Sequence, residues 1–380
     1  MRDVRFVAPA SRPAVADPEL VRPDSRTLAA RDPRLLWLDK NESTDPELAA
    51  TFTHVVSNVL SNLGSRALSS YPDCAPLYSK LANQLGLPVE SLFLAAGSDG
   101  VIRSVFEAFI SPGDLVIHPA PTFAMYPVYA RMYGAKTHAL EYRPSPTGPV
   151  LLLETVVSAI ANDHPKLVCL PNPDSPTGSV FDPTSLRRIV EAAGEAGALI
   201  LIDEAYHPFY EETALPWTKA FGHLVVARTF AKAWGLAGLR IGYAAAAPEV
   251  ANLLHKVRPM YEVNTVAVVA MERILDHEDA MRSSVRRLNE GRDYFIAEME
   301  TLGFRTVHCK GNFLHVAFGE MASSIHAALK DTVLYRQNAS EPCLKGFTRF
   351  SATTTTLFRP IVSVISRIVA RENGHTPGGH

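Results

Sequence analysis

The stretch ARTFAKAWGLAGLRIGY (227–243) places one lysine, Lys232, among small and apolar residues. Burial disfavours the charged form of an amine, so a lysine in such surroundings gives up its proton more readily than one in water. The neutral amine is a nucleophile that can add to the carbonyl group of a substrate or cofactor. The segment therefore predicts amine chemistry at Lys232, with an ordinary solvated surface lysine as the alternative.

Four segments of the chain have the composition of buried parallel strands. They are almost continuously apolar, which a sheet covered by helices on both faces requires. Helical periodicity separates them, and Asp182 and Pro183 have the residue types of an N-cap and a first helical residue. This alternation predicts an α/β domain with right-handed crossovers. The predicted strands are DLVIHPA (114–120), KLVCLPNP (166–173), ALILIDEAY (198–206) and HLVVARTF (223–230).

Ligands of open parallel sheets bind beyond the carboxyl ends of the strands. Asp203 and Tyr206 come after the apolar run ALILI (198–202) of one predicted strand, and Thr229 and Lys232 come after HLVVAR (223–228) of the next. We therefore expect a carboxylate, a phenol and an amine to lie close together. An Asp after a buried strand can also be no more than a cap or turn residue.

A phosphate-binding element is predicted beside these residues. The sequence AAGSDG (95–100) precedes a predicted helix, and the free N–H groups at a helix N-terminus attract phosphate. Ser98, Thr229 and Arg240 could complete the anion cup, although GSDG alone is also an ordinary loop. An amine, a carboxylate, a phenol and a phosphate cup together suit pyridoxal 5'-phosphate. Asp203 would keep the pyridine nitrogen protonated, so that the ring accepts negative charge, and Tyr206 would donate to the phenolic oxygen.

Composition limits the classes of partner. The 380 residues carry 37 basic and 39 acidic side chains, a net charge of −2, which argues against nucleic acid or an anionic membrane held by bulk charge. The four cysteines form no C-x-x-C pair, so neither a metal site nor a disulfide framework is predicted, and a reducing cytoplasm fits best. Charges and prolines interrupt the N-terminal region before a signal-peptide core, and no apolar run is long enough to span a membrane.

The chain length favours more than one domain. A long predicted helix over about 281–302, followed by short strands, indicates that the C-terminal part is a separate α+β unit. The predicted division is an extended N-terminal arm (1–37), a large cofactor-binding domain (38–262) and a small C-terminal domain (263–380).

The motifs NPDSPTG (172–178), IDEAY (202–206), RTFAKAWGLAGLRIGY (228–243) and GNFLHV (311–316) follow one another as in fold-type I pyridoxal-phosphate aminotransferases of classes I and II. Over residues 38–355 the chain resembles this family, and the histidinol-phosphate aminotransferase branch in particular. The resemblance implies an aspartate aminotransferase-like α/β fold, in which helices cover both faces of a mostly parallel sheet, with a smaller α+β C-terminal domain. It also implies that Lys232 holds the cofactor as a Schiff base and moves a proton once substrate displaces it.

The resemblance assigns roles to further residues by their positions in family motifs. Tyr71 matches a tyrosine that reaches the phosphate of the neighbouring subunit, which implies a homodimer with shared active sites. Phe123 would stack on the pyridine ring. The residues with implied cofactor contacts are Tyr71, Ser98, Asp99, Phe123, Ser175, Asp203, Tyr206, Thr229, Lys232 and Arg240, and those with implied substrate contacts are Asn41, Arg336 and Arg349.

The chain departs from the family pattern at three places. Ser175 stands where the second Asn of N-P-x-N-P-T-G donates to the cofactor's phenolic oxygen, and a shorter hydroxyl would change that contact. Phe123 stands where the histidinol-phosphate enzymes commonly have Tyr. The segment FSATTTTLFRP (350–360) lacks the acidic residues that usually follow the substrate arginine. These departures concern the substrate more than the fold or the cofactor.

The resemblance predicts an aminotransferase that passes an amino group from glutamate to a small anionic carbonyl substrate, phosphorylated or not, in a ping-pong cycle. A decarboxylase or lyase acting on an amino acid or phosphoamino acid is the alternative, because the sequence does not fix which bond at the α-carbon breaks. A cofactor-binding regulator with a DNA-binding head is a third reading. The arm before residue 38 is too short and irregular for a helix-turn-helix.

Overall fold

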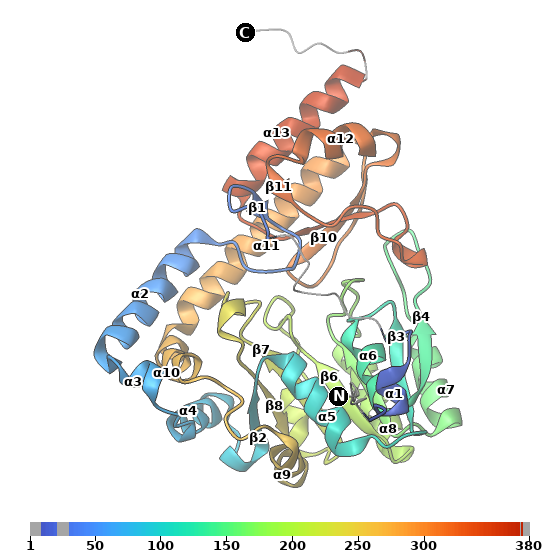
Figure 1. Ribbon diagram of the computed structural model, residues 1–380. Helices are drawn as coiled ribbons and strands as arrows, with labels where there is room; N and C mark the ends of the chain where they lie inside the picture. Colours follow the sequence, from blue (N-terminus) through green and yellow to red (C-terminus); the bar gives the residue numbers. More distant parts are fainter. Residues whose placement is uncertain (1–8, 21–29, 373, 375–380) are drawn as a thin grey trace, which may run out of the picture.

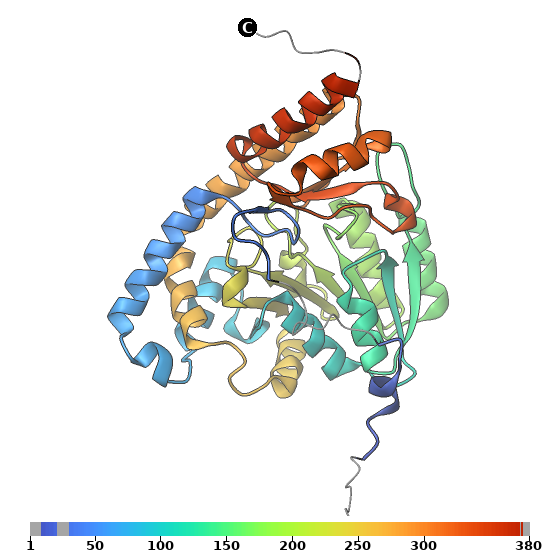
Figure 2. The same ribbon diagram turned by 45° about the horizontal axis from the view of Figure 1, so that its top comes forward.

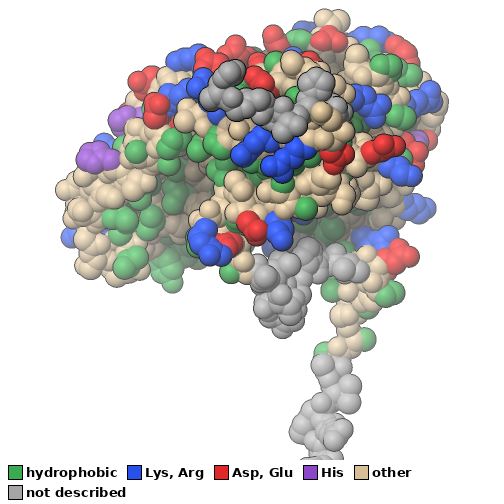
Figure 3. Space-filling view, turned by 90° about the horizontal axis from the view of Figure 1, so that it is seen from above, with side chains coloured by type: hydrophobic (Ala, Val, Ile, Leu, Met, Phe, Trp, Pro, Cys, Tyr) green, Lys and Arg blue, Asp and Glu red, His purple; other side chains and the backbone are tan. Residues whose placement is uncertain are grey.

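The computed structural model describes residues 9–20, 30–372 and 374. Two lobes are stacked on each other (Figures 1 and 2), and helices α2 (Pro46–Leu63) and α11 (Glu278–Thr301) run along one side of both. No helix in the described part of the chain is both long and apolar enough to cross a membrane. On the face seen in Figure 3, acidic and basic side chains are interspersed, in keeping with the small net charge.

The larger lobe is built on a seven-stranded sheet in the order β2-β8-β7-β6-β5-β3-β4. Strand β8 is antiparallel to both of its neighbours, and the other pairs are parallel. The predicted mostly parallel sheet is therefore confirmed. The strands are β2 (Leu92–Ala95), β3 (Leu115–Ala120), β4 (Lys136–Glu141), β5 (Leu167–Pro171), β6 (Leu199–Asp203), β7 (Leu224–Thr229) and β8 (Gly242–Ala246).

Helices cover both faces of this sheet. Residues alternate between two buried apolar clusters along each central strand, as Val116 and Ile117 of β3 do. Helix α8 begins as its sequence predicts, because the Asp182 side chain accepts from two backbone N–H groups and Pro183 is the first helical residue. One face carries α5 (Ser98–Phe109), α6 (Met125–Met132) and α9 (Pro248–Val257), and the other carries α4 (Ala75–Leu85), α7 (Leu153–Asp163), α8 (Pro183–Glu195) and α10 (Thr265–Ile274).

The smaller lobe has an antiparallel sheet in the order β12-β10-β9 and a separate apolar cluster. A parallel pair, β1 with β11, joins residues 36–37 to this lobe, and the buried Leu38 lies in its apolar cluster. The predicted domain bounds at 37/38 and 262/263 stay a prediction. The elements are β1 (Leu36–Trp37), β9 (Arg305–Val307), β10 (Phe313–Ala317), α12 (Ala322–Leu329), β11 (Val333–Leu334), β12 (Thr348–Ser351) and α13 (Thr355–Glu372), beside α11.

The predicted extended arm contains a short helix, α1 (Pro13–Ala16), that packs against α6. Beside it, Arg131 of α6 pairs with Asp17 and Glu19, so ion pairs attach this segment, although α1 itself has no buried residue. Residues 1–8 and 21–29 of the predicted arm lie outside the described residues. The remaining short elements are α3 (Arg66–Ser69) and the 3₁₀ turns η1 (Val89–Ser91), η2 (Leu215–Lys219), η3 (Ala237–Leu239), η4 (Leu275–His277), η5 (Gly319–Met321) and η6 (Pro342–Leu344).

Candidate active site

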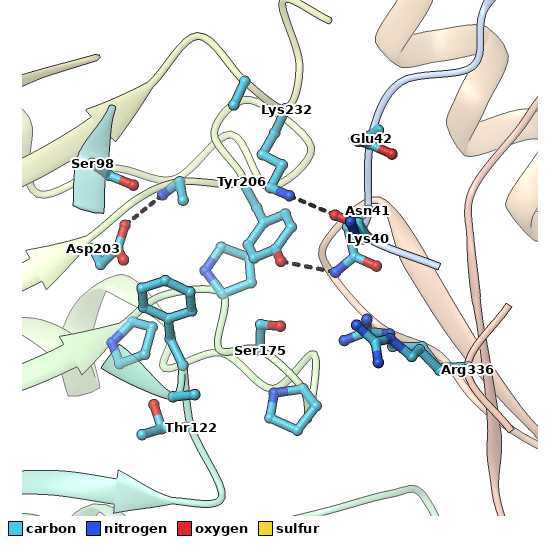
Figure 4. A pocket seen from close by; sticks show the side chains of 18 of the residues that line it. Lys40, Asn41, Glu42, Ser98, Thr122, Ser175, Asp203, Tyr206, Lys232 and Arg336 are labelled. Carbon is cyan, nitrogen blue, oxygen red and sulfur yellow. Dashed lines mark hydrogen bonds between the residues drawn. The ribbon is translucent and has the colours of Figure 1, made fainter. Parts of the chain in front are cut away.

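A cavity of about 690 Å³ lies at the carboxyl ends of β5, β6 and β7. The larger lobe supplies one wall, segment 40–42 supplies another, and the loop after β11 with strand β12 supplies the third. Figure 4 shows Lys232, Tyr206, Asp203 and Ser98 on the larger-lobe side, with Arg336 across the cavity. The cavity therefore lies at the edge of the sheet where the sequence predicted that the polar residues would gather.

Lys232 follows β7 and points into this cavity (Figure 4). Its Nζ donates to the backbone oxygen of Lys40 at 2.9 Å and lies 5.9 Å from the centroid of the Tyr206 ring. Burial, reinforced by the nearby guanidinium groups of Arg349 and Arg240, lowers the pKa of Lys232 to about 8. An appreciable fraction of this amine is therefore neutral near pH 8, as amine chemistry requires.

The lowered pKa of Lys232 predicts how fast the cofactor-free protein captures pyridoxal phosphate. Only the neutral amine attacks an aldehyde, so the rate should fall about tenfold per pH unit below pH 8 and level off above it. Stopped-flow absorbance across pH 6–10 measures this, with N-acetyl-lysine amide as the control amine of ordinary pKa. A protein profile that superposes on that of the free amine would contradict the assignment.

Asp203, the last residue of β6, is a buried carboxylate beside the cavity. Its Oδ2 accepts from the Tyr126 hydroxyl at 3.0 Å, and its Oδ1 accepts from the Ala205 backbone N–H at 3.0 Å. Burial raises the pKa of Asp203 to about 6, because these neutral donors only partly replace water. Within the described chain no lysine or arginine forms an ion pair with it. A protonated pyridine nitrogen in the cavity would supply the missing cation.

Tyr206 is held by a residue that precedes α2. Its hydroxyl accepts from Asn41 Nδ2 at 2.9 Å, and its ring packs edge-on against Phe313 at 5.4 Å. Asn41 is itself fixed, since its N–H donates to Ser351 Oγ and its carbonyl accepts from Asn312 Nδ2. The side-chain amide of Asn41, which we assigned to substrate from the sequence, therefore also orients the phenol of Tyr206.

The N-terminus of α5 lies beside the Arg240 guanidinium. Arg240 donates to the backbone oxygens of Ala96 and Ala237, at 3.1 and 3.3 Å. Gly97, the residue before the helix, has φ +83°, and a Cβ there would lie 3.0 Å from Arg240 Nη2. Ser98 and Thr229 line the same end of the cavity. Free helix N–H groups, a hydroxyl and a guanidinium without a carboxylate partner in the described residues fit a phosphate.

Two arginines line the opposite end of the cavity. Arg336 and Arg349 face each other in an isolated antiparallel bridge, and both donate to the backbone oxygen of Asp39, at 3.2 and 2.9 Å. Arg349 Nε is buried and has no hydrogen-bond partner among the described residues. The remaining guanidinium N–H groups can bind a carboxylate or phosphate.

The other predicted residues fall into two groups. Phe123 and Ser175 line the cavity, and Phe123 packs edge-on against Tyr126. Asp99 also lines it, but its side chain accepts from the Tyr129 hydroxyl. Tyr71 is not a lining residue of this cavity: it is 75% exposed and stacks on Tyr261, with ring centroids 4.0 Å apart. Its predicted role at a neighbouring subunit's phosphate is therefore not tested within one chain.

Several residues that line the cavity were not predicted from the sequence. Thr122 follows β3, so the rule of strand ends could have found it. Glu42 lines the cavity beside Asn41 and is paired in bidentate fashion with Arg31, which lowers its pKa. His315 comes from the smaller lobe and lies in the motif GNFLHV (311–316), a signal that was not used to select it. The remaining residues that sequence reasoning did not select include Lys40, Gln337, Asn338, Ser340 and Glu341.

The residues present fit pyridoxal phosphate. A buried carboxylate without a cation, an amine of lowered pKa and a guanidinium at a helix N-terminus surround one cavity. These three groups are complementary to a pyridine nitrogen, an aldehyde and a phosphate. Fold and cavity together define a fold-type I pyridoxal-phosphate enzyme.

Comparison with known proteins narrows this class. A family model described as "Aminotransferase class I and II" matches residues 33–365. The chain is 30% identical, over 83% of its length and 89% of the relative, to histidinol-phosphate aminotransferase of Caldanaerobacter subterraneus subsp. tengcongensis. It is 35% identical, over 72% and 76%, to histidinol-phosphate aminotransferase 1 of Burkholderia lata. The crystal structure of histidinol-phosphate aminotransferase from Sinorhizobium meliloti with pyridoxal-5'-phosphate has a TM-score of 0.74 at 22% identity, covering 89% and 91% of the chains.

The chain therefore belongs to the class I and II aminotransferases. The predicted fold, the cofactor pyridoxal 5'-phosphate and the resemblance to the histidinol-phosphate aminotransferase branch are confirmed. The comparisons do not favour the decarboxylase or lyase alternative. Neither the amino donor nor the acceptor follows from them.

Proposed function

We propose that this aminotransferase passes an amino group from glutamate to a small anionic carbonyl compound of the histidinol-phosphate type. The observation that carries the proposal is the separation of two anion-binding ends in one cavity. The α5 N-terminus with Arg240 occupies one end, and Arg336 with Arg349 occupies the other. A cofactor phosphate at the first end leaves the arginine pair for the anionic group of the substrate. The names of the curated relatives supply the substrate type.

Each residue around Lys232 has a distinct task in this proposal. Pyridoxal phosphate, when bound, supplies an aromatic ring that accepts the charge left at the substrate's α-carbon. Lys232 holds the cofactor covalently through Nζ and afterwards takes and returns the α-proton at the same atom. Asp203 keeps a positive charge at the pyridine nitrogen, and Tyr206, held by Asn41, donates to the phenolic oxygen. The arginine pair orients the substrate, which selects the bond that breaks.

We further propose a homodimer whose subunits share active sites. Leu68, Tyr71 and Met260 are each at least 75% exposed, and association with a second copy would remove such apolar side chains from water. Because Tyr71 lies outside the chain's own cavity, a second copy is the partner for it that the family resemblance predicts. Sedimentation equilibrium would contradict this proposal if the holoenzyme remained monomeric at micromolar concentration. The cytoplasmic location stays a prediction.

Replacing Arg349 with alanine should separate substrate binding from cofactor binding. Losing a charge-assisted hydrogen bond costs about 1.5–3 kcal/mol, so KM for the anionic substrate should rise about 10- to 150-fold. The dissociation constant of pyridoxal phosphate should change little, since Arg349 lies beside Arg336 and Asp39 and not at the α5 N-terminus, where Arg240 would hold the cofactor phosphate. Steady-state kinetics with glutamate and a panel of keto acids and phosphorylated carbonyl compounds measures KM, and equilibrium titration measures the cofactor. Equal weakening of both would make Arg349 a structural residue.

A further inference from the structure

A second buried carboxylate, Asp174, lies close to the cavity and has no task in the mechanism above. Its side chain is 0% exposed, and within the described chain no lysine or arginine forms an ion pair with it. Oδ1 accepts from the Thr122 hydroxyl at 2.9 Å, and Oδ2 accepts from the Thr177 hydroxyl at 2.7 Å. Burial raises the pKa of Asp174 to about 7. A carboxylate kept without a cation is costly, so a purely structural position would suit an amide or an apolar residue better.

The Asp174 side chain sits on a rigid turn. The Asp174 N–H donates to the Ser179 carbonyl, and the Asp174 carbonyl accepts from the Gly178 N–H, each at 2.9 Å. The smaller lobe holds the same turn, since the Lys310 N–H donates to the Gly178 carbonyl at 3.0 Å. A Cβ on Gly178 would lie 2.3 Å from the Cβ of Cys309, so the two segments are in close contact. The carboxylate is therefore a fixed anchor.

Asp174 anchors Thr122, the first residue of segment 122–126, which carries Phe123. Thr122 directly precedes Phe123, and Tyr126, three residues further on, donates to Asp203 at 3.0 Å. The Tyr126 N–H also donates to the Phe123 carbonyl at 3.1 Å. Two buried carboxylates from the ends of neighbouring strands thus hold segment 122–126 on both sides of the aromatic ring.

Core packing alone cannot fix the Phe123 ring. The side chain is 36% exposed, and its ring contact is the edge of Tyr126, with centroids 6.0 Å apart. Its position therefore depends on where the backbone of segment 122–126 is held. A ring displaced by about 1 Å loses much of its stacking on a flat partner, and misplacement of this size can cost catalysis heavily.

We propose that Asp174 is a positioning residue, which holds the Thr122 hydroxyl and thereby fixes the Phe123 ring at the stacking distance for the cofactor. This inference rests on the proposed function, because it needs pyridoxal phosphate under Phe123. Asp174 does not touch the reacting atoms. It acts on the Phe123 side chain through the Thr122 hydroxyl and the peptide bond between Thr122 and Phe123.

The test compares holoenzyme variants at the two hydroxyls that Asp174 accepts from. Thr122→Val removes the anchoring hydroxyl at constant shape, Thr122→Ser restores it, and Thr177→Val removes the hydroxyl on the other oxygen. The visible circular dichroism of bound cofactor reports the asymmetry of its surroundings. We expect Thr122→Val to change this signal and to lower kcat about tenfold with KM within about twofold of wild type. Thr122→Ser should recover both, and Thr177→Val should lower the melting temperature while leaving the signal intact.

Asp174→Ala is a further variant, which removes the acceptor of the Thr122 hydroxyl and should alter the dichroism in the same direction as Thr122→Val. A Thr122→Val holoenzyme with wild-type dichroism and kcat would overturn the proposal. An equal spectral change in Thr177→Val would also overturn it, since the link through Thr122 would then be irrelevant. Failure of the proposed function looks different: the wild-type holoenzyme would show its cofactor band and dichroism but would not transfer an amino group from glutamate to the carbonyl compounds of the panel.

Discussion

Lys232→Ala is expected to abolish transamination, with kcat falling by about 10⁴-fold or more. The variant loses both the nucleophile that holds the cofactor and the group that transfers the α-proton, and general acid–base catalysis alone contributes 10²–10⁴-fold. The visible absorption of covalently held cofactor should disappear, while pyridoxal phosphate remains bound through the α5 N-terminus and Arg240. Absorbance spectra and single-turnover kinetics measure the two effects.

The matched control for this variant is Lys166→Ala. Lys166 is an exposed lysine at the amino end of β5, the end of the strand that faces away from the cavity. Its removal should leave spectrum and rate unchanged. Methylamine in the buffer should partly restore the rate of Lys232→Ala, because a small amine can occupy the space left by the side chain. A Lys232→Ala protein that keeps the wild-type spectrum would end the assignment.

Asp203→Asn should lower kcat by at least about 100-fold without unfolding the protein. The amide is close in size and can still accept from the Ala205 N–H, but it carries no charge to hold a proton on the pyridine nitrogen. Cofactor affinity should also lose the part of its pH dependence that lies near pH 6. In the wild type the carboxylate is ionised above about pH 6 and neutral below it, so affinity should weaken as the pH falls through 6.

Glu204→Gln is the matched control, because Glu204 is the next residue and is also buried. Its carboxylate pairs with Arg228 at 2.8 Å on the far side of the strand end and does not line the cavity. This variant should lower the free energy of unfolding and leave kcat of the folded protein near that of the wild type. A near-normal kcat in Asp203→Asn would refute the proposal that Asp203 keeps the pyridine nitrogen protonated. An equal loss of kcat in Glu204→Gln would refute it as well.

The sheet and the residues at its strand ends could be predicted because each rests on local signals. Continuous apolar character marked the strands β5, β6 and β7, and their carboxyl ends in a parallel sheet must meet at one edge. Asp203 ends β6 and Lys232 follows the adjacent strand β7, so their shared cavity could be predicted without knowledge of the smaller lobe. The order of strands and the antiparallel β8 carry no such local signal, since they depend on crossovers through space.

The residues that approach from elsewhere could not be predicted in this way. Asn41 reaches Tyr206 from a segment 165 residues earlier, and His315 reaches the cavity from the smaller lobe. Asp174 was visible as a motif position, but its burial and its bond to Thr122 arise only when β3 and β5 become neighbours. Family resemblance supplied Arg336 and Arg349, whereas periodicity and spacing did not.

The pairing of β1 with β11 decides how the chain could be divided for expression. A fragment that began at residue 263 would lack one strand of that pair, and it would leave a hole where the fully buried Leu38 sits among C-terminal residues. Such a fragment would expose an unpaired edge and an apolar gap, both of which promote aggregation. To stay soluble, the smaller lobe would need residues 30–45 joined through a linker to the N-terminus of this fragment.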